Sequence, residues 1–220
     1  MSSPVISQAL KQDNYGVVLL NKINPRVRQK YSLFWSNSHI GYDKYDESIA
    51  FLTKLPVYEV DAFYCSQHQC ADSILSRKIL GLTVEYQGQL VDCYSCHINL
   101  PNCEGEDQLD NIRTIVERNQ SQNLKILMGD FNTDAISDPV SYQKIKCLGL
   151  LDTFDIAEQK DSGITVEKAI DGWNGHSEEK RLDYIFLNQP KQVLSSQVIF
   201  NGKNKPVVSD HFGLDVELIL

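Results

Sequence analysis

LKILMGDFN, residues 124–132, is the stretch on which the fold assignment depends. Its first residues are mostly apolar, as in a buried strand, and the run ends abruptly in Gly129-Asp130-Phe131-Asn132. Functional side chains often follow strands in this way, because the sheet holds the adjoining loop rigidly. We therefore expect a functional site where this strand ends.

Two further motifs place polar side chains within or beside apolar strands. Residues 181–186, RLDYIF, hold Asp183 in an otherwise apolar run, and residues 209–211, SDH, precede the last apolar segment. His97 falls near the end of the run at 90–100 in the same manner. Acids and histidines therefore recur at several strand ends.

Each motif also has a structural interpretation. Gly-Asp-Phe-Asn at 129–132 is compatible with an Asx turn, Asp183 with a buried pair to Arg181, and 209–211 with a polar strand start. A carboxylate inside an apolar strand is costly unless a partner compensates its desolvation. A histidine would supply that partner and have its tautomer fixed in return, which favours the functional interpretation.

The remaining pattern predicts more strands than helices. Strands are expected at 31–36, 48–54, 57–64, 79–86, 90–100, 124–130, 181–188, 192–200 and 213–220, and helices at 13–24, 106–119 and 138–148. Gln87-Gly88 predicts a tight hairpin turn. Neighbouring strands then run mostly antiparallel with helices interspersed, which favours a layered α+β sandwich over a doubly wound parallel sheet.

Composition predicts one globular domain over residues 1–220. The chain is 42% hydrophobic, and no repeat or linker divides it. Its net charge of -8 argues against binding nucleic acid through phosphates, because the densest basic stretch, 21–30, has the composition of a solvated helix end. No leader or membrane span is visible, so we expect a cytoplasmic protein without a membrane partner.

The six cysteines include one C-x-x-C, formed by Cys93 and Cys96. The motif lies in an expected strand, where residues three apart point to opposite faces, and no second pair follows at zinc-site spacing. We expect free thiols, with a redox or metal role as the alternative.

GDFN, RLDYIF and SDH, in this order, resemble the signature motifs of the endonuclease/exonuclease/phosphatase superfamily. The resemblance covers nearly the whole chain. It implies the deoxyribonuclease-I-like fold, an α+β four-layer α/β/β/α sandwich of two mostly antiparallel sheets flanked by helices, with the site at one edge. It also implies a phosphoric ester hydrolase that depends on Mg²⁺ or Mn²⁺.

The resemblance implies a role for each matching residue. Asp130 orients or activates the attacking water and shares the metal site, and Asn132 hydrogen-bonds phosphoryl oxygens. Asp183 pairs with His211, whose imidazole faces the scissile phosphate, and Asp210 is a metal ligand. Carboxylate and amide oxygens without thiolates suit Mg²⁺, and an aligned water with charge stabilisation is what phosphoryl transfer needs.

Two more residues follow from the same likeness. His97 corresponds to a histidine that contacts phosphate and assists the leaving oxygen. Glu47 corresponds to the acid that pairs with that histidine, although Ser48 stands where the family usually has glycine.

Residues 34–42 and 160–173 resemble one branch of the superfamily, the bacterial sugar-phosphate phosphatases of the maltose 6'-phosphate phosphatase type. His39 and Trp173 are therefore expected to contact a phosphorylated sugar. Core packing is the alternative for both tryptophans, and the Ile-Asn-Leu-Pro after His97 departs from the Gly-Trp-Trp of that branch.

The superfamily normally opens with a strand bearing Asn and a second strand ending in Gln-Glu, whose Glu binds the metal. This sequence has neither, so the expected fold lacks its first strands. The leading functional hypothesis is a Mg²⁺-dependent phosphomonoesterase acting on a phosphorylated sugar. The alternatives are a nuclease or phosphodiesterase on the same fold, and a catalytically impaired fragment that only binds.

Overall fold

Two hydrophobic cores lie on opposite faces of one central sheet. The structure, a computed structural model, describes residues 10–41, 45–101, 103, 105–167 and 179–220. Its central sheet has six strands in the order β3-β4-β5-β6-β9-β7. These are β3 (Val57–Tyr64), β4 (Lys78–Tyr86), β5 (Gln89–His97), β6 (Leu124–Asp130), β9 (Asp183–Leu187) and β7 (Leu151–Asp152).

A second layer of strands covers one face of this sheet. It comprises the hairpin of β1 (Ser32–Gly41) with β2 (Tyr45–Thr53), and a three-stranded sheet of order β11-β10-β8. The latter is built from β11 (Gly213–Ile219), β10 (Gln192–Ile199) and β8 (Gln159–Lys160). Leu82, Val91, Ile126 and Leu187 face this layer and form the first core.

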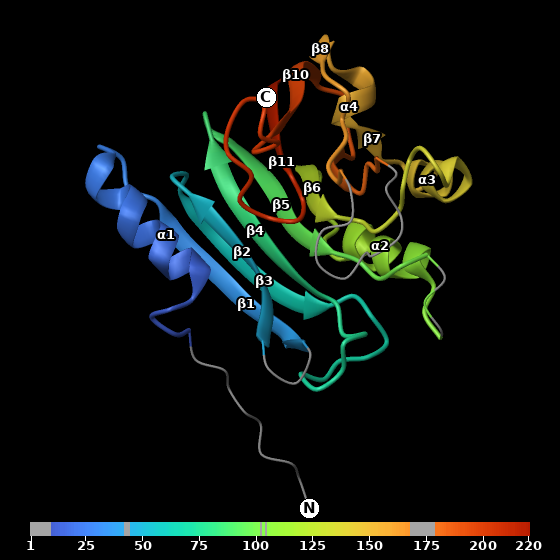
Figure 1. Ribbon diagram of the computed structural model, residues 1–220, viewed down its shortest axis with the longest axis horizontal. Coiled ribbons are helices and arrows are strands. Elements are labelled where there is room, and N and C mark those ends of the chain that lie inside the picture. The colour runs from blue at the N-terminus through green and yellow to red at the C-terminus, as the bar shows by residue number, and fades with distance from the viewer. Residues whose placement is uncertain (1–9, 42–44, 102, 104, 168–178) are drawn as a thin grey trace, which may run out of the picture.

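Helices cover the opposite face of the central sheet. α2 (Gln108–Glu117) and α3 (Pro139–Lys146) lie there, and α1 (Tyr15–Ile23) packs outside β1 and β2 (Figure 1). Two shorter helices are η1 (Asn24–Arg26) and α4 (Thr153–Ile156). The order of layers is α/β/β/α, as expected from the sequence.

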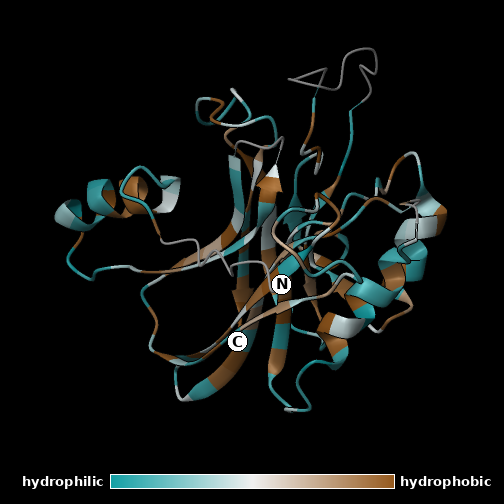
Figure 2. Ribbon diagram, turned by 90° about the horizontal axis from the view of Figure 1, so that it is seen from below, coloured by the Kyte–Doolittle hydropathy of each residue, from teal (hydrophilic) through white to brown (hydrophobic). Residues whose placement is uncertain are grey.

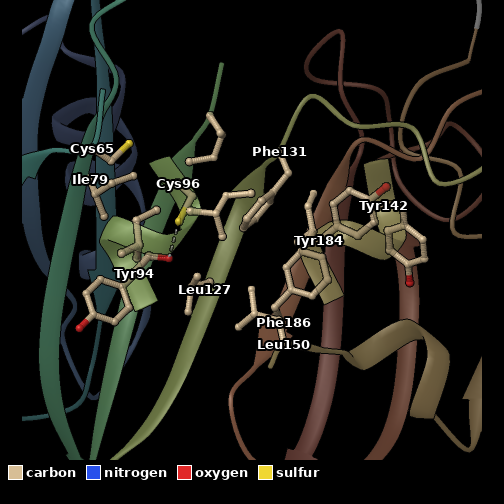
Figure 3. Close-up of a cluster of buried hydrophobic side chains, with 14 of the residues drawn as sticks. Cys65, Ile79, Tyr94, Cys96, Leu127, Phe131, Tyr142, Leu150, Tyr184 and Phe186 are labelled. Carbon is tan, nitrogen blue, oxygen red and sulfur yellow. Dashed lines mark hydrogen bonds between the residues drawn. The ribbon is translucent and has the colours of Figure 1, made fainter. Parts of the chain in front are cut away.

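The second core lies between the central sheet and α2 and α3. Phe131, Tyr184 and Phe186 meet there in edge-to-face and stacked contacts with ring centroids 4.9 to 5.9 Å apart (Figure 3). Successive residues of β9 alternate between the two cores, since Tyr184 and Phe186 face the helices whereas Ile185 and Leu187 face the other sheet. Figure 2 shows hydrophobic segments running along the central strands.

The sequence predicted the main elements well and the short ones poorly. β4 and β5 form the expected antiparallel hairpin, with left-handed φ angles of 50° at Gln87 and 80° at Gly88. β5 and β6 are instead parallel, joined through α2, and β7, β8 and α4 were not predicted. Cys93 and Cys96 face different cores, and all six cysteines are free thiols, as expected.

β1 and β2 extend further than the sequence predicted. β1 runs to Gly41 instead of residue 36, and β2 begins at Tyr45 instead of residue 48. Most of the additional residues are polar, so hydrophobic periodicity does not mark them. The longer hairpin pairs His39 directly with Glu47 across the strands.

Candidate active site

Three adjacent central strands place their polar residues in one row. His97 at the end of β5 is in register with Asp130 at the end of β6, and Asp130 is in register with Asp183 at the start of β9. Residues in register on neighbouring strands carry their side chains to the same face of a sheet. The row brings together three residues that are far apart in the sequence.

His211, just before β11, completes this row. Its Nδ1 lies 2.9 Å from Oδ2 of Asp183, the contact predicted from the otherwise unexplained acid in an apolar strand. Burial favours the neutral imidazole, but the hydrogen bond and the charge of Asp183 outweigh it and raise the pKa of His211 to about 9. His211 is therefore protonated at neutral pH in the metal-free chain.

The turn after β6 fixes Asn132. Oδ1 of Asp130 accepts a hydrogen bond of 2.7 Å from the backbone N–H of Asn132, whose φ of 49° is left-handed. Nδ2 of Asn132 donates to the carbonyl of Ile98 at 2.8 Å. The structural interpretation of GDFN as an Asx turn is thus correct, and the turn leaves Oδ1 and one amide hydrogen of Asn132 for a ligand.

Asp130 lies in an electrostatically unfavourable position. Burial raises the pKa of its carboxyl group to about 7, and the neighbouring Asp183 adds to the effect, while His211 and the N–H of Asn132 oppose it. The charge of Asp183 makes ionisation of Asp130 less favourable, and a bound cation would offset this effect. A group that titrates near neutral pH is also suited to take a proton from water.

His97 contacts both an acid and a base. Its Nε2 lies 3.6 Å from Oδ2 of Asp130 and 3.3 Å from Nη1 of Arg77. Burial, followed by the charge of Arg77, lowers the pKa of His97 below its usual range. The side chain is 41% exposed, which moderates the shift, but the direction alone leaves the ring neutral at pH 7.

Glu47 lies beside His39 rather than forming the expected pair with His97. Nε2 of His39 is 3.0 Å from Oε2 of Glu47, a close electrostatic contact that lacks the alignment of a hydrogen bond. Nδ1 of His39 is 2.9 Å from the carbonyl of Ser76, which holds the buried ring in place. The expected pairing was wrong because β1 and β2 extend far enough to bring these two residues opposite each other.

A cleft of about 550 Å³ opens over this part of the molecule. Its wall is strongly polar and carries the three carboxylates of Asp46, Glu47 and Asp210. Hydroxyls and imidazoles complete it. The lining residues are Ser38, His39, Asp46, Glu47, Ser48, Ile49, His97, Ser209 and Asp210.

Asp130, Asp183 and His211 form a group suited to a metal ion. One ligand atom from each lies within 4.8 Å of the others. Nδ1 of His211 already contacts Asp183, so oxygen atoms of the two aspartates and of Asn132 are the better donors. An oxygen set of this kind fits a hard divalent cation, and a bound cation would offset the burial and the charge of Asp183 that raise the pKa of Asp130.

Asp210 does not belong to this group, and Trp173 is not among the residues that the structure describes. Asp210 is exposed, accepts a hydrogen bond of 3.0 Å from Ser209 and lines the cleft, outside the group formed by Asp130, Asp183 and His211.

Sequence reasoning missed Arg77 and its anchor Asn99. Nε of Arg77 donates to Oδ1 of Asn99 at 2.7 Å, directly behind His97. A single arginine before a strand has no distinguishing spacing, so only the fold identifies it.

Comparison with solved structures identifies the family. The whole chain superposes on an endonuclease/exonuclease/phosphatase family protein from Leptotrichia buccalis C-1013-b, with a TM-score of 0.91 and 49% identical residues, covering 83% of that chain. The chain belongs to the endonuclease/exonuclease/phosphatase family. No family model matches it, and no curated protein matches it in sequence.

More distant solved structures share the fold. A mannosyl-6-phosphatase from Bacteroides thetaiotaomicron VPI-5482 has a TM-score of 0.66 at 18% identity, over 93% of this chain and 82% of that one. TDP2 from C. elegans also has a TM-score of 0.66, at 16% identity over 94% of this chain and 62% of that one. Among the described residues of this family member, no helix has the length and apolar character of a membrane span.

Proposed function

We propose that this chain is a divalent-metal-dependent phosphomonoesterase that hydrolyses a phosphorylated sugar. The observation that carries the proposal is the row of His97, Asp130 and Asp183 closed by His211. Asp130 titrates near neutral pH, the imidazole of His211 is protonated, and the imidazole of His97 is neutral. These are the groups that phosphoryl transfer by water requires.

Each of these side chains has a separate role in the proposed hydrolysis. Asp130 accepts a proton from the attacking water, whose oxygen forms the new bond to phosphorus as the bond to the leaving oxygen breaks. Asp183 holds His211 with its charged imidazole beside the phosphoryl group. The neutral ring of His97 donates a hydrogen bond to the leaving oxygen, which takes its proton from solvent while Asp130 releases to solvent the proton it accepted. The products are the free alcohol and orthophosphate.

Asp130, Asp183 and Asn132 would hold Mg²⁺ or Mn²⁺, as their oxygen atoms suggest. When bound, such an ion neutralises charge on the phosphoryl oxygens and polarises the phosphorus centre.

The cleft supports a sugar as the leaving group. Carboxylates accept hydrogen bonds from hydroxyl groups, whereas they repel the phosphates that flank the scissile bond in a nucleic acid. The mannosyl-6-phosphatase neighbour has the same fold, which is compatible with this substrate class but does not decide it. Glu47 would contact the sugar from the cleft wall, and Asp210 from its rim. The ring of His39 is buried, so the expected contact of His39 with the sugar is wrong; His39 lies against Glu47 instead.

The test is hydrolysis of 4-nitrophenyl phosphate and a panel of hexose and disaccharide phosphates. Activity is expected with Mg²⁺ or Mn²⁺ and lost in excess chelator. Asp130→Ala and His211→Ala should each lower kcat by about 10²–10³ or more, because each removes a charged group placed at the reacting centre. Arg113→Gln, an exposed change on α2, serves as the control.

Hydrolysis that continues in chelator would rule out the metal mechanism. Faster cleavage of single-stranded or duplex DNA than of any sugar phosphate would favour the nuclease alternative. If no ester is hydrolysed with any metal ion, the remaining alternative is a catalytically impaired protein of this fold that only binds its ligand.

A further inference from the structure

No described carboxylate forms an ion pair with the guanidinium group of Arg77, although Glu47 and Asp130 favour its charged form from a longer distance. Among the described residues, this guanidinium group contacts Asn99 and the ring nitrogens of His97. The only other arginine in the described part of the chain that is not exposed, Arg181, donates to Asp152 at 2.6 Å. A shielded guanidinium group without an acid is costly, and burial accordingly lowers the pKa of Arg77.

The local structure holds Arg77 rigidly. Its backbone N–H donates to the hydroxyl of Ser66 at 2.8 Å, and its Nε donates to Asn99. Asn99 is itself buried and fixed, because its side chain donates to the carbonyl of Leu75 and its own carbonyl accepts from Gln108. Such anchoring orients the guanidinium group before any ligand arrives, which lowers the entropy lost on binding.

A purely structural role does not account for this arrangement. Glu106 is a buried acid that contacts the same loop and could have paired with Arg77. Its oxygens instead accept hydrogen bonds from the backbone N–H groups of Gln67 and His68 and from the side chain of Asn111. The loop that precedes β4 therefore provides no described carboxylate that forms an ion pair with the guanidinium group of Arg77. The guanidinium group adjoins the reacting centre instead, since Nε2 of His97 lies 3.3 Å from Nη1 of Arg77 and 3.6 Å from Asp130.

We propose that Arg77 binds a non-bridging phosphoryl oxygen and selects phosphate monoesters over diesters. The guanidinium group is a planar donor that suits phosphate oxygens. A monoester dianion carries one more anionic oxygen than a diester, and Arg77 supplies a positive charge for it beside His97. The preference for monoesters rests on the proposed function, whereas phosphate binding by Arg77 does not.

The primary experiment measures orthophosphate binding by isothermal titration calorimetry at pH 8 with Mg²⁺ present. Arg77→Gln is expected to weaken binding about 10–100-fold, as loss of a charge-assisted hydrogen bond does. Arg77→Lys, which keeps the charge but loses the bond to Asn99, should fall between Arg77→Gln and wild type. Arg113→Gln should bind as wild type does, and thermal unfolding checks that each variant is folded.

The second readout compares kcat/KM for 4-nitrophenyl phosphate and for methyl 4-nitrophenyl phosphate. Arg77→Gln should lower the value for the monoester at least 10-fold more than the value for the diester, whereas misplacement of His97 alone would lower both equally. Orthophosphate binding by Arg77→Gln that equals wild type, or no binding by wild type, overturns the proposal. Phosphate binding that depends on Arg77 without hydrolysis of any ester would contradict the proposed function alone.

Discussion

Asp130 and Asp183 lie in register at the ends of paired strands, and the charge of Asp183 raises the free energy of ionising Asp130. Burial adds to this effect, and the pKa of Asp130 rises to about 7. A group whose pKa is raised by folding contributes stability below its unfolded pKa of 3.8, and the contribution is lost as the pH rises through about 7. Function at this site therefore opposes stability.

Asp130→Asn should accordingly stabilise the metal-free protein. At pH 8 in chelator we expect an increase of about 1–4 kcal/mol in the free energy of unfolding, because the amide removes the charge and keeps the shape. The gain should vanish at pH 4, where wild-type Asp130 is largely protonated. Urea unfolding at the two pH values measures both quantities, and an equal gain at both would contradict the electrostatic explanation.

His211 provides a direct test of its bond to Asp183. Asp183→Asn should lower the pKa of His211 from about 9 toward its ordinary value of 6.5, since it removes the charge and weakens the hydrogen bond that outweigh burial. Titration of the imidazole C–H signals by nuclear magnetic resonance, in chelator, gives the value. A pKa that stays near 9 in the variant would assign the shift to Asp130 or Asp210 instead.

At the level of single elements, the end of β6 depends on Gly129. Its φ of 135° suits glycine alone, and an added Cβ would lie 2.0 Å from the carbonyl oxygen of Cys96 on β5. That close approach keeps His97 and Asp130 in register. Any larger residue must move one strand away from the other.

Gly129→Ala should therefore destabilise the protein by about 3 kcal/mol or more and lower kcat at least 10-fold. Gly149→Ala is the matched control: its φ of 83° is also left-handed, but no atom lies within 4 Å of the added Cβ. The control should lose only about 1 kcal/mol and keep its kcat. Thermal unfolding and a phosphatase assay compare them, and equal losses in stability would mean that backbone strain, not the contact with Cys96, dominates.

The same elements explain what the sequence could and could not predict. β6 and β9 are marked by apolar runs that end or begin at an acid, so their polar residues were found and the fold class followed. The pairing of His39 with Glu47 was not predictable from periodicity, because polar residues continue the β1–β2 hairpin past its apolar part. Arg77 was missed because only the folded loop before β4 brings its guanidinium group against His97, which is 20 residues away in the sequence.

At the scale of the whole molecule, the charge distribution favours the proposed sugar phosphate over a nucleic acid as substrate. The chain has a net charge of -8, and the cleft itself carries three carboxylates. Proteins that bind nucleic acids without sequence preference do so mainly by placing lysine and arginine against the phosphates, and the released counterions drive the association. The described part of the cleft wall offers no such row of cations.

We therefore expect no measurable binding of a 20-nucleotide single strand or duplex at 50 mM salt, by fluorescence anisotropy with protein concentrations up to about 10⁻⁴ M. The matched measurement is hydrolysis of a sugar phosphate at 50 and 200 mM salt. A small dianion held by Arg77, His211 and a metal ion makes few charged contacts, so kcat/KM should change by less than about 10-fold, against 10³–10⁵-fold for a protein with 6–10 phosphate contacts. Tight oligonucleotide binding with a steep salt dependence would indicate a basic surface outside the cleft and would restore the nuclease alternative.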